Sequence, residues 1–122
     1  MRFVNPVTVT LPLTGEDWIQ VKDALSVGDQ KQVEASGLTR LRPGTKDTDE
    51  GNAFDLDLAA FSFARTLAYL TDWSFKGADG KDVKVTKASV AALTVEAYQE
   101  IEDAITAHVE ARDAAKKSQA GG

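Results

Sequence analysis

The residues that could carry acid–base or nucleophilic chemistry are few and widely spaced. The chain has one histidine, His108, and no cysteine. Nucleophilic catalysis needs a base beside the nucleophile and a third group that orients the base, and no Gly-x-Ser-x-Gly element presents a serine here. Adjacent carboxylates such as Glu102 and Asp103 do not face one another on a helix, so we expect them to be solvated. The sequence therefore predicts a non-enzymatic protein, in which His108 packs at the edge of an apolar stripe.

Two segments match ligand-binding loops only in part. Gly77–Asp82 contains glycines and a lysine, but their spacing is not that of a phosphate-binding loop. The acidic segment that begins at Asp47 fits the first and third positions of a calcium loop. It fails at the fifth, sixth and twelfth positions, which are Gly51, Asn52 and Leu58. We expect no metal and no cofactor, and the missing cysteines exclude thiolate-zinc sites.

Composition and charge restrict the partners. The 122 residues are 43% hydrophobic and 27% charged, which is a globular balance of one-domain size. The 14 basic and 19 acidic residues give a net charge of −5, which argues against nucleic acid as a partner. No apolar run approaches the roughly 20 residues that span a bilayer, and the opening residues lack the apolar segment of a signal peptide. We therefore expect neither nucleic-acid nor membrane binding.

An interaction surface is the remaining kind of functional site. Large aromatic side chains in loops often anchor partners, although core packing is the favoured alternative for them. An amphipathic helix near the C-terminus offers a further apolar face, which more often packs on its own domain than on a partner. The predicted partner-binding residues are Trp73, Phe75, Tyr98, Ile101, Ile105 and Val109.

Two short strands and a polar helix are predicted to precede these residues. Val7–Leu11 alternates apolar residues with threonine and lies between two prolines, which is typical of a short edge strand. Trp18–Lys22 reads as a second strand, joined to the first by a turn. A polar helix over Gln30–Leu38 follows, with Ser26 or Asp29 as its cap.

The remaining elements are mainly helical. An apolar helix over about residues 54–70 is predicted to be central, or to meet a partner with one face. Residues 71–85 form a hairpin or an ordered loop with a turn at Asp79-Gly80, and a short helix then runs to Leu93. An amphipathic helix spans about residues 94–115. The fold class is α+β: a small antiparallel β element with three to four helices. Residues 1–115 form one domain with an acidic loop at about 42–53, and 116–122 form a flexible tail.

Several of these patterns resemble the tail assembly chaperones of long-tailed bacteriophages. The resemblance is carried by the stretch Ala68-Tyr69-Leu70-Thr71-Asp72-Trp73-Ser74-Phe75. This stretch is followed by Asp79-Gly80-Lys81-Asp82-Val83, a short helix and an acidic helix over Glu96–His108. The segment led by Trp18, with Leu25-Ser26-Val27-Gly28-Asp29 and a polar helix, is similar to their opening region. The resemblance covers most of residues 16–110.

The resemblance implies a function without chemistry. Such chaperones bind the long tape measure protein, keep its hydrophobic helices soluble and help the tail tube assemble around it. The resemblance further implies that the protein acts in the cytoplasm of the bacterial host and is absent from the mature virion. It also implies the tail tube protein as a second partner. Whether the protein forms a homo-oligomer is left open by the sequence. Phage head-to-tail or tail-completion adaptors are similar in size and composition, so a structural adaptor is the first alternative. A small hydrolase or calcium-dependent domain is the second.

Overall fold

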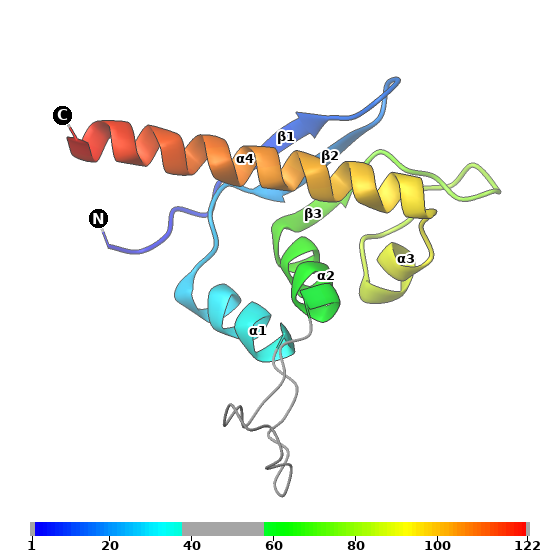
Figure 1. Ribbon diagram of the computed structural model, residues 1–122. Helices are drawn as coiled ribbons and strands as arrows, with labels where there is room; N and C mark the ends of the chain where they lie inside the picture. Colours follow the sequence, from blue (N-terminus) through cyan, green and yellow to red (C-terminus); the bar gives the residue numbers. More distant parts are fainter. Residues whose placement is uncertain (1, 38–57, 122) are drawn as a thin grey trace, which may run out of the picture.

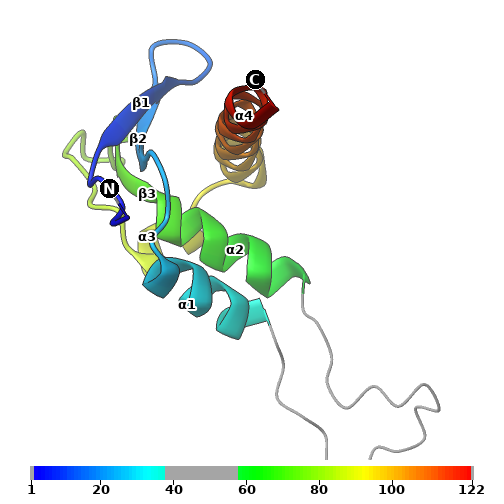
Figure 2. The ribbon, with the colours of Figure 1, turned by 90° about the vertical axis from the view of Figure 1, so that its left-hand side faces the viewer.

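A three-stranded antiparallel sheet and four helices make up the part of the chain that the computed structural model describes, residues 2–37 and 58–121. The sheet has the strand order β1-β2-β3, with β1 at Thr8–Pro12, β2 at Trp18–Lys22 and β3 at Leu70–Trp73. The long helix α4, Val95–Gly121, runs across one face of the sheet (Figure 1). Helices α1, Val27–Gly37, and α2, Leu58–Tyr69, lie together below it (Figure 2). The predicted α+β class is confirmed.

The hairpin of β1 and β2 positions the centre of the core. Its register places Val9 opposite Val21 and Leu11 opposite Ile19, so one face of the hairpin is apolar. Gly15 takes a φ of 70° in the connecting turn, a conformation that glycine adopts without strain. Ile19 and Val21 are fully buried because β2 is the middle strand and its apolar face lies under α4.

The third strand differs from the sequence prediction, which placed Leu70 in the apolar helix. Helix α2 ends at Tyr69, and Leu70 begins β3 directly. Leu70 pairs with Val21 and Trp73 with Ile19, and the side chains of Leu70 and Trp73 are both buried. Pairing with β2, far away in the sequence, therefore overrides the helical periodicity at this point.

Side-chain caps set where the helices begin. The amide of Asp29 donates to Ser26 Oγ at 3.1 Å and the amide of Ser26 donates to the Asp29 carboxylate at 3.3 Å, so α1 starts at Val27, ahead of its predicted start at Gln30. Thr86 and Ser89 cap the short helix α3, Lys87–Ala91, in the same reciprocal way. Thr94 accepts from the amide of Ala97, as expected for the start of α4.

The C-terminal helix extends further than predicted. We expected it to end near residue 115, but α4 continues to Gly121. Residues 114–120 are rich in alanine and lysine and contain no glycine or proline, so nothing in the local sequence breaks the helix there.

The core lies where α4 and the end of α2 meet the sheet. The fully or almost fully buried apolar residues are Ile19, Val21, Tyr69, Leu70, Trp73, Val90, Ile101 and Ile105. Helix α2 packs against α1, α4, β2 and β3, which agrees with its predicted central position. Its predicted first turns and the acidic loop at about 42–53 lie outside the described residues. Within the described ranges, no helix combines the length and apolar character needed to cross a membrane.

Candidate partner-binding groove

The structure brings all six predicted partner-binding residues into one cluster, and that cluster is the core. Trp73 is 5% exposed, and Ile101 and Ile105 are completely buried. Their half-buried neighbours in the cluster are Phe75, Tyr98 and Val109. In this conformation the three buried side chains offer no surface to a partner, so contact with them would require α4 to move away from the sheet.

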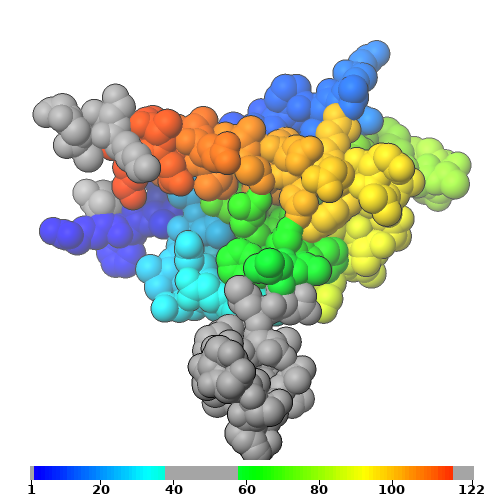
Figure 3. All heavy atoms as spheres, viewed as in Figure 1, coloured from blue at the N-terminus to red at the C-terminus, as the bar shows by residue number. Residues whose placement is uncertain are grey.

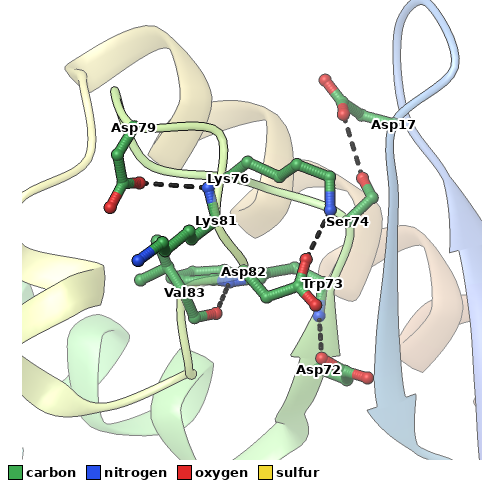
Figure 4. Close-up of polar contacts among 9 residues, drawn as sticks. All are labelled: Asp17, Asp72, Trp73, Ser74, Lys76, Asp79, Lys81, Asp82 and Val83. Atoms are coloured by element: carbon green, nitrogen blue, oxygen red, sulfur yellow. Dashed lines mark hydrogen bonds and ion pairs between the residues drawn. The ribbon is translucent and has the colours of Figure 1, made fainter.

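The position of the Trp73 side chain is also fixed by a hydrogen bond (Figure 4). Its indole Nε1 donates to the carbonyl oxygen of Val83 at 2.7 Å, and its ring lies 5.1 Å from that of Phe75, measured between centroids. The connecting segment is an ordered loop with one bridge between Lys76 and Asp82. Gly80 has a φ of 78°, which confirms the predicted turn. Trp73 therefore joins this loop to the core.

Helix α2 is only partly covered, although it is apolar on most sides. Among its described side chains, Thr66 and Tyr69 are buried, whereas Phe61, Phe63 and Leu67 keep part of their surface exposed. The sequence left two alternatives for this helix, a core helix or one that meets a partner with one face. The partial exposure leaves apolar area available for a partner.

The uncovered side of α2 contributes to a groove where α1, α2 and α4 meet. Figure 3 shows the face on which these helices come together, with α1 and α2 beneath α4. The groove has a volume of about 230 Å³. Its apolar lining consists of Leu25, Val33, Phe61, Tyr69 and Val109, and its polar lining of Gln30, Glu34 and Arg65. An apolar floor with a few charged groups suits the apolar face of a partner helix.

Polar contacts between α2 and α4 support one wall of the groove. Arg65 donates to Thr106 Oγ1 at 2.6 Å, which holds the guanidinium between the two helices. Thr66, which has no exposed surface, lies 3.3 Å from the hydroxyl of Tyr98. Ser62 donates to the carboxylate of Glu102. These contacts fix the distance between α2 and α4 and so the width of the groove.

Further polar contacts anchor α4 along its length. Near its start, the Glu100 carboxylate accepts hydrogen bonds from the hydroxyl of Thr14 and from the amide of the same residue, the latter at 2.6 Å, and these two bonds lower the pKa of Glu100. Further along, His108 Nε2 lies 3.0 Å from the carbonyl oxygen of Asp23. Arg112 pairs with the carboxylate of the same residue. His108 thus packs at the edge of the apolar face, as expected.

The groove was only partly foreseeable. Val109 belongs to the predicted set and lines it, whereas the other five predicted residues do not. Phe61 belongs to the predicted apolar helix over about residues 54–70, and Val33, which also lines the groove, is buried. The available signal was the apolar character of α2 around its circumference, which exceeds what burial in a small core requires.

Two other hollows lie elsewhere on the surface, and neither gathers catalytic groups. One, of about 270 Å³, lies on the opposite side of α1 and α2 and includes Gln32, Ser36 and Leu67. The other, of about 300 Å³, lies beside the N-terminal segment and includes Val4, Lys22 and Thr71. Within residues 2–37 and 58–121, no group of three or more histidine, cysteine or acidic side chains is arranged to hold a metal ion.

Comparisons with known proteins supply no relatives. No protein-family model matches the chain, and neither a curated protein nor a solved structure matches it significantly. The groove and the sequence resemblance are therefore the grounds on which a function can be proposed.

Proposed function

We propose that this protein is a non-enzymatic tail assembly chaperone of a long-tailed bacteriophage or prophage. The proposal rests on the resemblance carried by residues 68–108 and by the segment that begins at Trp18. On this proposal it binds the tape measure protein, assists assembly of the tail tube, acts in the cytoplasm of the bacterial host and does not remain in the mature virion. Neither nucleic acid nor a membrane takes part.

The observation that supports this function best is the groove between α1, α2 and α4. A chaperone of this kind must cover apolar segments of its partner, and the groove exposes parts of Phe61 and Val109 for that purpose. Glu34 and Arg65 supply one charge of each sign at the same place. An amphipathic helix could bury its apolar side there and pair its flanking charges with these two residues.

The first test is co-expression with the tape measure protein encoded near it, followed by affinity capture and size-exclusion chromatography with light scattering. We expect a soluble complex from a partner that precipitates when expressed alone. A protein that forms no complex, runs as a closed ring and remains in purified particles would instead be a structural adaptor, which is the competing proposal.

A pair of substitutions in α4 tests the groove itself. Val109→Lys places a charge in the groove, and its long stem can lift the ammonium group toward water. Val95→Lys is the matched control, because Val95 lies in the same helix and is 78% exposed away from the groove. We expect Val109→Lys to lower capture of the tape measure protein at least tenfold and Val95→Lys to leave it unchanged.

Glu34→Lys provides a check that does not depend on core packing. Glu34 is exposed, so reversal of its charge should preserve the fold while it changes the electrostatics of the groove. Far-UV circular dichroism and the melting temperature of each variant must match those of the parent protein. Equal capture by all three folded variants would show that the partner binds elsewhere.

A further inference from the structure

The edge strand β1 has an almost symmetrical sequence. Residues 6–12 read Pro-Val-Thr-Val-Thr-Leu-Pro, so that Val9 is the centre, Thr8 and Thr10 flank it, and a proline stands at each end. Two antiparallel copies of such a segment, related by a two-fold axis at Val9, place threonine opposite threonine and proline opposite proline. A self-complementary surface of this kind is what a two-fold interface requires.

The outer edge of β1 is open for such pairing. The strand order β1-β2-β3 leaves one side of β1 without a neighbouring strand among the described residues. Figure 2 shows β1 at the edge of the sheet that lies away from α1 and α2.

The direction of the backbone groups of β1 follows from two hydrogen bonds at its ends. The carbonyl oxygen of Val7 accepts from the amide of Asp23, and the amide of Leu13 donates to the carbonyl oxygen of Asp17, each at 2.9 Å. Odd-numbered residues therefore bond to β2. Because successive residues of an antiparallel strand direct their backbone groups to opposite sides, the N–H and C=O groups of Thr8 and Thr10 point outward.

The two prolines leave Thr8 and Thr10 as the residues of this segment whose N–H groups point outward. With Val9 opposite Val9, each Thr8–Thr10 pair can exchange both of its backbone hydrogen bonds, and each proline lies opposite a proline, so that no threonine carbonyl faces a proline nitrogen. A shift of two residues would place Thr8 opposite Pro12, which has no N–H to donate. Among these antiparallel registers, only the symmetrical one pairs both the N–H and the C=O of Thr8 and of Thr10 in each copy.

We propose that β1 pairs with β1 of a second copy of this chain, antiparallel and centred on Val9, to form one continuous sheet across the dimer. The side chains agree with this arrangement. Thr8 and Thr10 are exposed on the outer face, where cross-strand threonine pairs are favourable. Val7, which is 44% exposed, lies on the other face and would be covered by Leu11 of the second copy. The symmetry of the sequence favours a second copy over a strand of another protein. This inference does not depend on the chaperone proposal.

A charge pattern tests both the interface and its register. In the proposed dimer, residue 8 of one copy lies opposite residue 10 of the other. The double variant Thr8→Glu/Thr10→Glu therefore places like charges opposite each other, whereas Thr8→Glu/Thr10→Lys places opposite charges there. Both variants share the substitution at Thr8, which faces Lys22 within the same copy. Mass is measured by light scattering and by sedimentation velocity over a range of concentrations.

The expected result is specific. The parent protein should have twice the 13.1 kDa mass of the chain. The Glu/Glu variant should be a monomer, and the Glu/Lys variant should regain the dimer. A monomeric parent, a dimer that persists in the Glu/Glu variant, or two monomeric double variants would each overturn the proposal.

Thr10→Pro tests the same strand edge if the Glu/Glu variant fails to fold. The N–H of Thr10 points away from β2, so proline there removes an outward donor and leaves the β1–β2 hydrogen bonds in place. This variant should also be a monomer with an unchanged circular dichroism spectrum. A folded Thr10→Pro variant that remains dimeric would exclude the β1 edge as the interface.

Discussion

Gly37, the last residue of α1, lies directly against Phe61 of α2. A Cβ atom placed on Gly37 would stand 2.7 Å from the Cβ of Phe61, closer than carbon atoms of two side chains approach. The absence of a side chain at Gly37 thus allows α1 and α2 to pack closely at this end. The same contact holds Phe61 in the lining of the groove between α1, α2 and α4.

Substitution of Gly37 by alanine should therefore destabilise the protein. The added methyl group must push the helices apart, and such overpacking typically costs about 1–3 kcal/mol, against a gain in helix propensity of about 1 kcal/mol. Gly28→Ala in the same helix is the control, because the nearest atom to its added Cβ is Ser26 Oγ at 3.8 Å. Urea unfolding should give a lower midpoint for Gly37→Ala only; a midpoint at or above that of the parent would contradict the close packing.

Trp73→Phe should destabilise the loop after β3. Phenylalanine retains an aromatic ring but loses the indole donor, which leaves the carbonyl of Val83 without its partner at a cost of about 1–3 kcal/mol. Trp18→Phe is a suitable control, since the hydrogen bonds described at Trp18 use only its backbone. The free energy of unfolding measured in urea should fall more for Trp73→Phe than for Trp18→Phe. Equal losses would show that the indole hydrogen bond contributes little.

Asp29 predicts a pH dependence of stability on the acid side. The hydrogen bond from the Lys22 ammonium is the main cause that lowers the pKa of this carboxyl below its ordinary value of 3.8, and the amide of Ser26 adds to it. Since the folded pKa is the lower one, the stabilisation is complete above the ordinary value and is lost as the pH falls through the folded pKa. Asp29→Asn should therefore reduce the loss of stability between about pH 4 and pH 2.

Lys22→Met isolates the cause of that effect. It removes the main group that lowers the pKa of Asp29 but leaves the carboxylate in the first turn of α1. Thermal melts from pH 7 to pH 2 should show a shallower acid-side decline for both variants. A decline as steep as that of the parent in Lys22→Met would show that the ion pair does not set the pKa.

The elements with strong local patterns were predictable. Trp18–Lys22 is a strand over the predicted residues, because its buried Ile19 and Val21 alternate with half-buried neighbours. Ile101 and Ile105 occupy the buried side of α4, as their helical spacing indicates. Strand β3 could not be predicted in this way. It has only four residues, two of them exposed, and its structure depends on pairing with β2.

The groove was likewise predictable only in part, because the local sequence indicates the character of each helix but not how the helices are placed relative to one another. The sequence indicates that Phe61 lies on an apolar helix and that Val109 lies on an amphipathic one. It contains no signal for the relative placement of α1, α2 and α4, which depends on the close contact at Gly37 and on hydrogen bonds such as that between Arg65 and Thr106. Side chains assigned to a partner from periodicity alone, such as Ile101, lie instead where the helix meets its own sheet.

Helix α4 is continuous in space but consists of two thermodynamic units. Its first half carries Ile101 and Ile105 into the core, so that part unfolds only when the whole domain does. From Glu110 to Lys116 every side chain is exposed, and this half extends past the sheet (Figure 1). Beyond the ion pair of Arg112 with Asp23, its helicity follows the helix–coil equilibrium of an isolated peptide, which declines gradually with temperature. Heating therefore shortens the helix from its free end before the cooperative transition, and amide exchange accelerates along α4 in the same direction.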